Sequence, residues 1–116
     1  VFFSSCAINY TKDPIKTIKS IIKLNAKYLY FTRTPLVENQ SLAFKQISLL
    51  SDNGPCKINN EKEILIEYEN KIVSRQSFES MFKNKFVIID KYIDQKKAFF
   101  YKKEFFDTYT YIFKKK

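Results

Sequence analysis

The sequence has little of the residues that most often mark a phosphate loop or a catalytic triad. It contains one glycine, Gly54, and no histidine among 116 residues. A single glycine excludes a glycine-rich phosphate or dinucleotide loop within the chain. The lack of histidine excludes sites that use an imidazole, either as a metal ligand or as the base of a triad.

Cysteine and arginine are scarce as well. Cys6 and Cys56 are too few for a four-ligand zinc site or a disulfide framework, so we interpret them as free thiols and expect a cytoplasmic protein without a metal. Arg33 and Arg75 are the only arginines. No apolar run approaches the roughly 18 residues of a membrane span, and we expect none.

Apolar, aromatic and basic residues are abundant. Hydrophobic residues make up 45% of the chain and aromatic residues 17%, which is typical of a folded domain. The net charge is +9, from 21 Lys and Arg against 12 Asp and Glu. Such a charge favours nucleic acid or an anionic surface as a partner. The lysines are spread along the whole chain, however, and we interpret the charge mainly as a solvated surface.

Hydrophobic periodicity and capping residues predict the first elements. Residues 1–6 (VFFSSC) predict a short, fully buried strand. Asp13 as N-cap and Pro14 at the first helical position predict an amphipathic helix that ends near Asn25. Residues 27–32 predict a second strand. A strand, a helix and a strand in short succession predict a parallel pair with a right-handed crossover.

The second half of the chain predicts a less regular order. Residues 33–60 predict a long irregular connection, of a kind that is often functional. The expected elements are a strand in 42–50, a strand-like segment at 63–70, a helix at 74–84 capped by Ser74, a strand at 85–94, and a final strand at 108–115 that residues 95–107 could extend into a hairpin.

Three short motifs occur in order along the first third of the chain: Ser4-Ser5, then Tyr10 before Asp13-Pro14, then Arg33-Thr34-Pro35. With the ending IVSRQSFESMF…KFVIIDKYID…YTYIFKKK, they resemble a bacterial group of class I S-adenosylmethionine-dependent methyltransferases. The order of elements is similar to the C-terminal half of that fold, in which the last strand inserts antiparallel between the fifth and the sixth. The likeness is weakest over residues 40–70, where this chain lacks the Pro- and Trp-rich segment that the resemblance would imply.

The resemblance implies an α/β fold that forms part of a Rossmann-like methyltransferase sheet. It implies that residues 1–116 are one domain, the C-terminal part of a longer one, and that the cofactor is S-adenosylmethionine. The main cofactor loop would then lie upstream of Val1. The implied partner is a small-molecule or sugar-type methyl acceptor.

Ligands of open α/β sheets bind at the carboxyl ends of the strands. In a methyltransferase, residues after the first strand would border the cofactor and the acceptor, and residues after the second would lie on the acceptor side. The candidate cofactor-binding residues are Ser4, Ser5, Cys6 and Asn9, and the candidate catalytic residues are Tyr10 and Arg33. Tyr10 would orient or deprotonate an acceptor hydroxyl, and Arg33 would pair with an anionic acceptor.

Structural and non-enzymatic alternatives remain open. The two serines could be small residues beneath a packed helix, and Tyr10 an ordinary rim residue. The segment KKAFFYKKEFF (96–106) interleaves lysine with aromatic residues, which is typical of single-stranded nucleic-acid binding. A hairpin with core aromatics and solvated lysines is the competing interpretation of that segment. A non-catalytic scaffold domain is the third possibility.

Overall fold

The computed structural model describes residues 1–38, 42–49, 65–101 and 104–116. The segment around Gly54 and Cys56, and with it much of the predicted connection, lies outside the described residues. The chain is an α/β protein with a mixed sheet, as predicted. Its elements are β1 (Phe2–Ser5), the short 3₁₀ helix η1 (Ile8–Tyr10), α1 (Pro14–Ile22), β2 (Tyr28–Val37), β3 (Leu42–Leu49), β4 (Leu65–Ser74), α2 (Arg75–Phe82), β5 (Phe86–Tyr101) and β6 (Glu104–Lys115).

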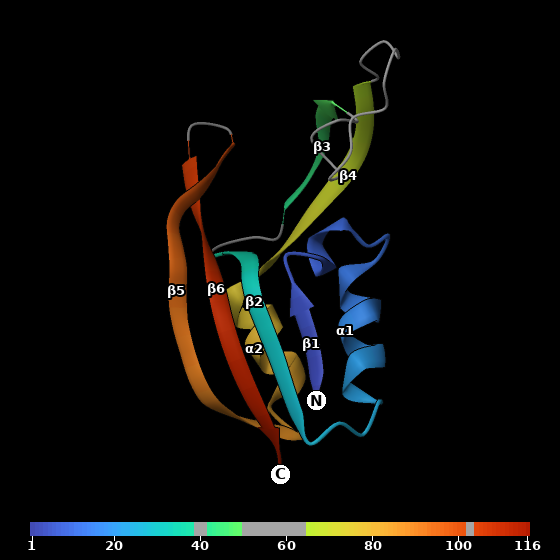
Figure 1. The fold of residues 1–116 in the computed structure, drawn as a ribbon, viewed down its shortest axis with the longest axis vertical. Coiled ribbons are helices and arrows are strands. Elements are labelled where there is room, and N and C mark those ends of the chain that lie inside the picture. The colour runs from blue at the N-terminus through green and yellow to red at the C-terminus, as the bar shows by residue number, and fades with distance from the viewer. Residues whose placement is uncertain (39–41, 50–64, 102–103) are drawn as a thin grey trace, which may run out of the picture.

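The sheet is organised around β2 (Figure 1). β1 pairs parallel to one edge of β2, with Phe2 opposite Leu29, which confirms the predicted parallel pair. β6 pairs antiparallel to the other edge of β2, and β5 pairs antiparallel to β6. The last strand of the chain therefore lies between β2 and β5. The expected C-terminal hairpin is confirmed.

β2 is longer than the sequence predicts. It continues to Val37, and β4 pairs parallel with its end through Leu36 opposite Val73. β3 and β4 form an antiparallel pair whose far end Figure 1 shows reaching away from the helices, while the other end of β4 leads into α2. The irregular connection predicted from residue 33 was therefore wrong for residues 33–37, because β6 and β4 supply a partner ladder that the local sequence does not reveal.

The predicted helix caps are confirmed. The Asp13 carboxylate accepts a hydrogen bond from the Lys16 backbone N–H at 3.0 Å, and the Ser74 hydroxyl accepts one from the Ser77 N–H at 3.2 Å. Each side chain satisfies one of the free N–H groups at the start of a helix. Asn25 has the left-handed geometry expected of it, at φ 58°, although α1 itself ends at Ile22.

Both helices pack against the same face of the sheet and form the core there. Ile18 of α1 and Phe78 and Phe82 of α2 are buried against strand residues of that face. The rings of Phe82 and Phe113 stack with their centroids 4.1 Å apart. The Phe31 ring meets the Phe78 ring edge-on at 5.5 Å. Aromatic pairs in these geometries contribute beyond the area that they bury.

The opposite face of the sheet is not covered by either helix. Phe3 is 58% exposed, and its ring centroid lies 5.4 Å from that of Tyr30. Tyr92 on β5 is 48% exposed. The prediction of a fully buried first strand was therefore wrong. Only alternate side chains of β1 face the core, because strand side chains alternate between the two faces and both helices lie on one of them.

Candidate functional site

The candidate site lies where β1 ends beside an irregular point in the middle of β2. The Cys6 backbone N–H donates to the Thr32 carbonyl at 3.0 Å and joins the carboxyl end of β1 to this point of β2. One residue further on, Arg33 donates from Nε to the Ser5 hydroxyl at 3.1 Å. The fold therefore brings together three of the predicted residues, Ser5, Cys6 and Arg33. Ser5 and Cys6 lie at the carboxyl end of β1, which is where ligands of α/β sheets bind, and Arg33 lies beside them within β2.

A bulge in β2 presents Arg33. Phe31 pairs with Tyr111 and Thr34 with Tyr109, so Thr32 and Arg33 together oppose one residue of β6. Arg33 has φ 47°, in the left-handed region that disfavours any residue with a Cβ. Bulges bend a strand and re-aim a side chain, and they are frequent beside active sites.

The carboxylate of Asp94 holds this bulge. It accepts a hydrogen bond from the Arg33 backbone N–H at 2.8 Å and one from the Thr110 hydroxyl at 2.7 Å. The Thr108 hydroxyl donates to its other oxygen. Asp94 itself sits in a bulge of β5, between Ile93 opposite Tyr109 and Gln95 opposite Thr108. One side chain therefore ties β5 to β6 and to β2.

Asp94 and its two threonine partners were missed by the sequence analysis. A weak signal was present, because Asp94 ends the strand-like segment KFVIIDKYID (85–94) and aspartate is uncommon in strands. Nothing local says which residue such a carboxylate would meet. Its partner Arg33 is 61 residues away in sequence.

The thiol of Cys6 lies in the same neighbourhood but is a poor nucleophile. Burial raises its pKa above the ordinary value, and the opposing charge of Arg33 does not compensate for this, while Asp94 adds to the rise. A thiol with a raised pKa is protonated near neutral pH, and the thiolate is the reactive form. Cys6 also has φ 48°, so the residue after β1 and the bulge of β2 each have left-handed geometry.

The other predicted residues are distributed differently. Ser4 pairs with Phe31 and lies by strand alternation on the helix-covered face, opposite to Ser5. Asn9 is buried and its amide donates to the Asn70 side chain at 2.9 Å. Asn9 lines a small cavity of about 10 Å³, which has room for about one water molecule. Tyr10 is 41% exposed at the end of η1. The proposed ligand contacts of these residues stay predictions.

Arg75, the other arginine, lies in a second cluster of charged and phenolic groups that links α2 to β2 and β6. Its guanidinium pairs with Glu38 at 2.6 Å and lies over the Tyr109 ring at 4.9 Å. Tyr109 donates to Glu38 at 3.1 Å, and Tyr111 donates to Glu79 at 2.6 Å. The carboxylates of this cluster pair with the cations beside them, Glu38 with Arg75 and Glu79 with Arg75 and Lys91, so we interpret the cluster as structural.

The pKa values of this cluster follow its pairing. The hydrogen bond from Arg75 lowers the pKa of the Glu38 carboxyl, and burial, with the hydrogen bond to Glu79, raises the pKa of the Tyr111 hydroxyl. Glu79 is partly buried, which would raise its pKa, but hydrogen bonds from Tyr111 and Lys91 lower it overall. Each group is stabilised in its ordinary charge state at neutral pH.

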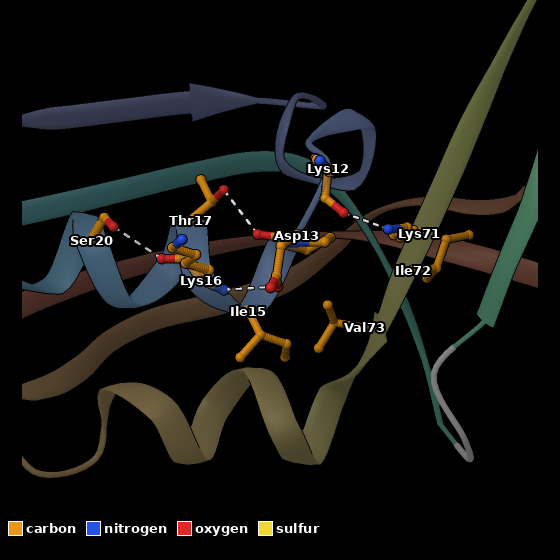
Figure 2. A pocket seen from close by; sticks show the side chains of 10 residues that line it. Lys12, Asp13, Ile15, Lys16, Thr17, Ser20, Lys71, Ile72 and Val73 are labelled. Carbon is orange, nitrogen blue, oxygen red and sulfur yellow. Dashed lines mark hydrogen bonds between the residues drawn. The ribbon is translucent and has the colours of Figure 1, made fainter.

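A basic groove of about 840 Å³ lies between α1 and β4, apart from the cluster around Arg33. Figure 2 shows the side chain of Lys71 directed from β4 toward the Lys12 carbonyl, to which it donates a hydrogen bond. Asp13 and Thr17 are engaged at the helix start, as the dashed lines in Figure 2 show. The groove brings three lysines together, Lys12, Lys16 and Lys71.

Two further observations bear on ligands and partners. Among residues 1–38, 42–49, 65–101 and 104–116, no three His, Cys, Asp or Glu side chains lie together in a way that could hold a metal ion. No helix in that part of the chain is long and apolar enough to span a membrane.

Comparisons with known proteins add no relative. No protein-family model matches the chain. No curated protein matches it. No solved structure matches it.

Proposed function

We propose that this chain is the acceptor-side part of a class I S-adenosylmethionine-dependent methyltransferase. The observation that carries the proposal is the strand order β1-β2-β6-β5, with the last strand antiparallel between β2 and β5. Helix α1 connects β1 to β2, and α2 precedes β5, as in the second half of that fold. The sequence motifs that resemble the same family supply an independent support.

The bare sheet face gives a second support. A methyltransferase sheet carries helices on both faces, and parallel strands are usually covered on both sides. Here Phe3 and Tyr92 stay exposed on the face opposite α1 and α2. In the proposed enzyme, helices from the cofactor-binding half would cover this face. The glycine-rich loop for the cofactor would come from that half too, because Gly54 is the only glycine here.

Bound S-adenosylmethionine would supply an electrophilic methyl group on its sulfonium. Ser5, at the carboxyl end of β1, would contribute a hydroxyl at the border between cofactor and acceptor. Arg33 would bind an anionic group of the acceptor and hold it in line with the methyl group, since transfer requires close alignment. Tyr10 would orient the acceptor hydroxyl or take its proton.

The test uses the product of the complete open reading frame that encodes these 116 residues. Calorimetry should detect binding of S-adenosylhomocysteine, and Ser5→Ala should weaken it. Ser80→Ala is the matched control, because the Ser80 hydroxyl donates to the Ser77 carbonyl within α2, away from the candidate site. A complete gene product that binds neither S-adenosylmethionine nor S-adenosylhomocysteine would sink the proposal.

One observation favours a second candidate, binding of single-stranded nucleic acid by the end of the β5–β6 hairpin. Phe100 and Phe105 are 62% and 56% exposed, with ring centroids 4.8 Å apart, and Lys97 lies over the Phe105 ring. Stacking platforms for bases combine such rings with positive charge. The other aromatics of the hairpin, Phe99, Tyr101 and Phe106, pack with Val37 and Ile72 instead.

A further inference from the structure

We propose that Asp94 is the positioning residue of an anion-binding site whose receptor is Arg33. The site would take a carboxylate or phosphate group. That this group belongs to the methyl acceptor rests on the function proposed above. The binding of the anion and the role of Asp94 rest on the geometry of the two bulges.

The first step is that two irregular points of the sheet face one another. The bulge of β2 at Thr32 and Arg33 and the bulge of β5 at Asp94 lie on either side of the same short stretch of β6. Thr108 and Thr110 from that stretch both donate to the Asp94 carboxylate. The third donor is the Arg33 backbone N–H, at 2.8 Å. Asp94 therefore fixes the backbone of Arg33 from across an intervening strand.

The second step is that the guanidinium of Arg33 is not neutralised. No carboxylate in the described ranges forms an ion pair with it, and its described side-chain partner is the neutral Ser5 hydroxyl, bonded through Nε. Asp94 binds the backbone of Arg33 rather than its charge. Arg75 shows the contrast, since Glu38 and Glu79 surround it and Tyr109 lies beneath it.

The third step concerns what such an arginine can bind. With Nε engaged by Ser5, the two terminal amino groups of the guanidinium remain available. Their planar pair of N–H donors matches a carboxylate or a phosphate, which accept bidentate hydrogen bonds. The left-handed backbone conformation of Arg33 costs free energy, because its Cβ lies close to the following carbonyl oxygen. Strain of this kind persists where the surrounding structure enforces it, and it clusters at functional sites.

The experiment titrates the ¹⁵N-labelled complete gene product with inorganic phosphate and, separately, with acetate at constant ionic strength. The Nε–H resonance of Arg33, assigned with Arg33→Lys, reports binding. We expect a saturable shift of this resonance in the wild type. The anion that binds more tightly identifies the group that the site prefers. An Arg33 resonance that responds to neither anion would overturn the proposal.

Asp94→Asn separates positioning from simple electrostatics. Removing a negative charge near Arg33 would by itself strengthen anion binding. We expect about tenfold weaker binding instead, because the amide cannot replace the charged acceptor that holds the bulge. Asp90→Asn is the matched control: it makes the same change of charge four residues earlier on β5, and within the described part of the chain the Asp90 side chain has no hydrogen bond. We expect its affinity to stay within about twofold of the wild type.

Two further measurements keep the inference testable whatever Asp94→Asn does. If that variant does not fold, Thr110→Val removes one hydroxyl that holds Asp94 and leaves every charge in place, and it should also weaken binding. Unchanged or tighter anion binding in Asp94→Asn, or unchanged binding in Thr110→Val, would overturn the positioning role. Binding of S-adenosylhomocysteine by the same samples tests the proposed function separately, so the two can fail independently.

Discussion

At the scale of single residues, backbone conformation marks the candidate site more clearly than side-chain type does. Among the residues that the structure describes, four other than glycine have a positive φ: Cys6, Asn25, Arg33 and Lys97. Asn25 follows a helix, where this geometry is common. Cys6 follows the end of β1 and Arg33 lies in the bulge of β2, and hydrogen bonds join the two places. Unfavourable backbone is therefore concentrated where the end of β1 meets β2.

Comparing two substitutions of Arg33 measures this backbone cost. Arg33→Gly and Arg33→Ala remove the same guanidinium, but only glycine adopts φ 47° freely. We expect the glycine variant to be the more stable by about 1 kcal/mol in chemical denaturation. Lys91 provides the control, because it lies in β5 without a positive φ. There the order should reverse, with alanine more stable than glycine; the same order at both positions would refute strain at Arg33.

The pairing of Glu38 predicts a pH dependence of stability. The hydrogen bond from Arg75 holds the folded-state pKa of Glu38 below its ordinary 4.5. A lowered folded pKa contributes stability above the unfolded pKa, and this contribution is lost as the pH falls through the folded value. Glu38→Gln should therefore be less stable than the wild type at pH 7, and the gap should close below pH 4.5. Because Glu38 is well exposed, we expect a gap under about 1 kcal/mol. A gap that is independent of pH would contradict this.

At the scale of elements, α2 is held to the sheet by aromatic stacking. Phe82 is 1% exposed and its ring stacks on Phe113 of β6, while Phe78 from the preceding turn meets Phe31 of β2. The helix begins immediately after β4 and ends just before β5. Its packing therefore fixes how the long β5–β6 hairpin joins the rest of the sheet.

Two phenylalanine substitutions compare the stability contributed by a core ring with that contributed by an exposed ring. Phe82→Ala should lower the free energy of unfolding by about 3–5 kcal/mol, because it leaves a cavity under α2. Phe105→Ala, at a residue that is 56% exposed, should cost about 0.5 kcal/mol or less. Urea unfolding followed by circular dichroism measures both. Similar losses from the two variants would mean that Phe82 is not a core anchor.

At the scale of the whole molecule, the helices divide the protein into a covered and an uncovered face. All the packing of α1 and α2 is on one side, and aromatic side chains such as Phe3 and Tyr92 stay exposed on the other. The chain has a net charge of +9, and three of its lysines line the groove between α1 and β4. Weak attraction to any polyanion follows from that charge.

The charge predicts how the protein should respond to an oligonucleotide. We expect weak binding to a single-stranded oligonucleotide that falls steeply with NaCl, because it depends on counterion release. The double variant Phe100→Ala/Phe105→Ala should bind as the wild type does if the aromatic pair has no part in it. Phe3→Ala, on the bare face, is the control. Losing about 1–3 kcal/mol per stacked base in the double variant, with the control unaffected, would favour the nucleic-acid function instead.

The sequence by itself determined the local features of this protein. Asp13 and Ser74 cap their helices because a capping side chain reaches an N–H group only three residues away. The parallel β1–β2 pair follows from a helix of nine residues between two strands. It also placed Ser5 and Cys6 at the end of the first strand, whereas Arg33, expected after the second strand, lies within it. These features depend on neighbours in sequence, so periodicity and composition are enough to predict them.

Only the tertiary structure decided what surrounds Arg33. The bulge that presents it exists because Asp94 lies across β6, and the two residues are 61 positions apart. The exposure of Phe3 was decided in the same way, since it depends on which face the two helices cover. The different surroundings of Arg33 and Arg75 arise from such pairings as well. Hydrogen bonds between distant strands leave no periodic pattern in the sequence, because each is set by how whole strands align.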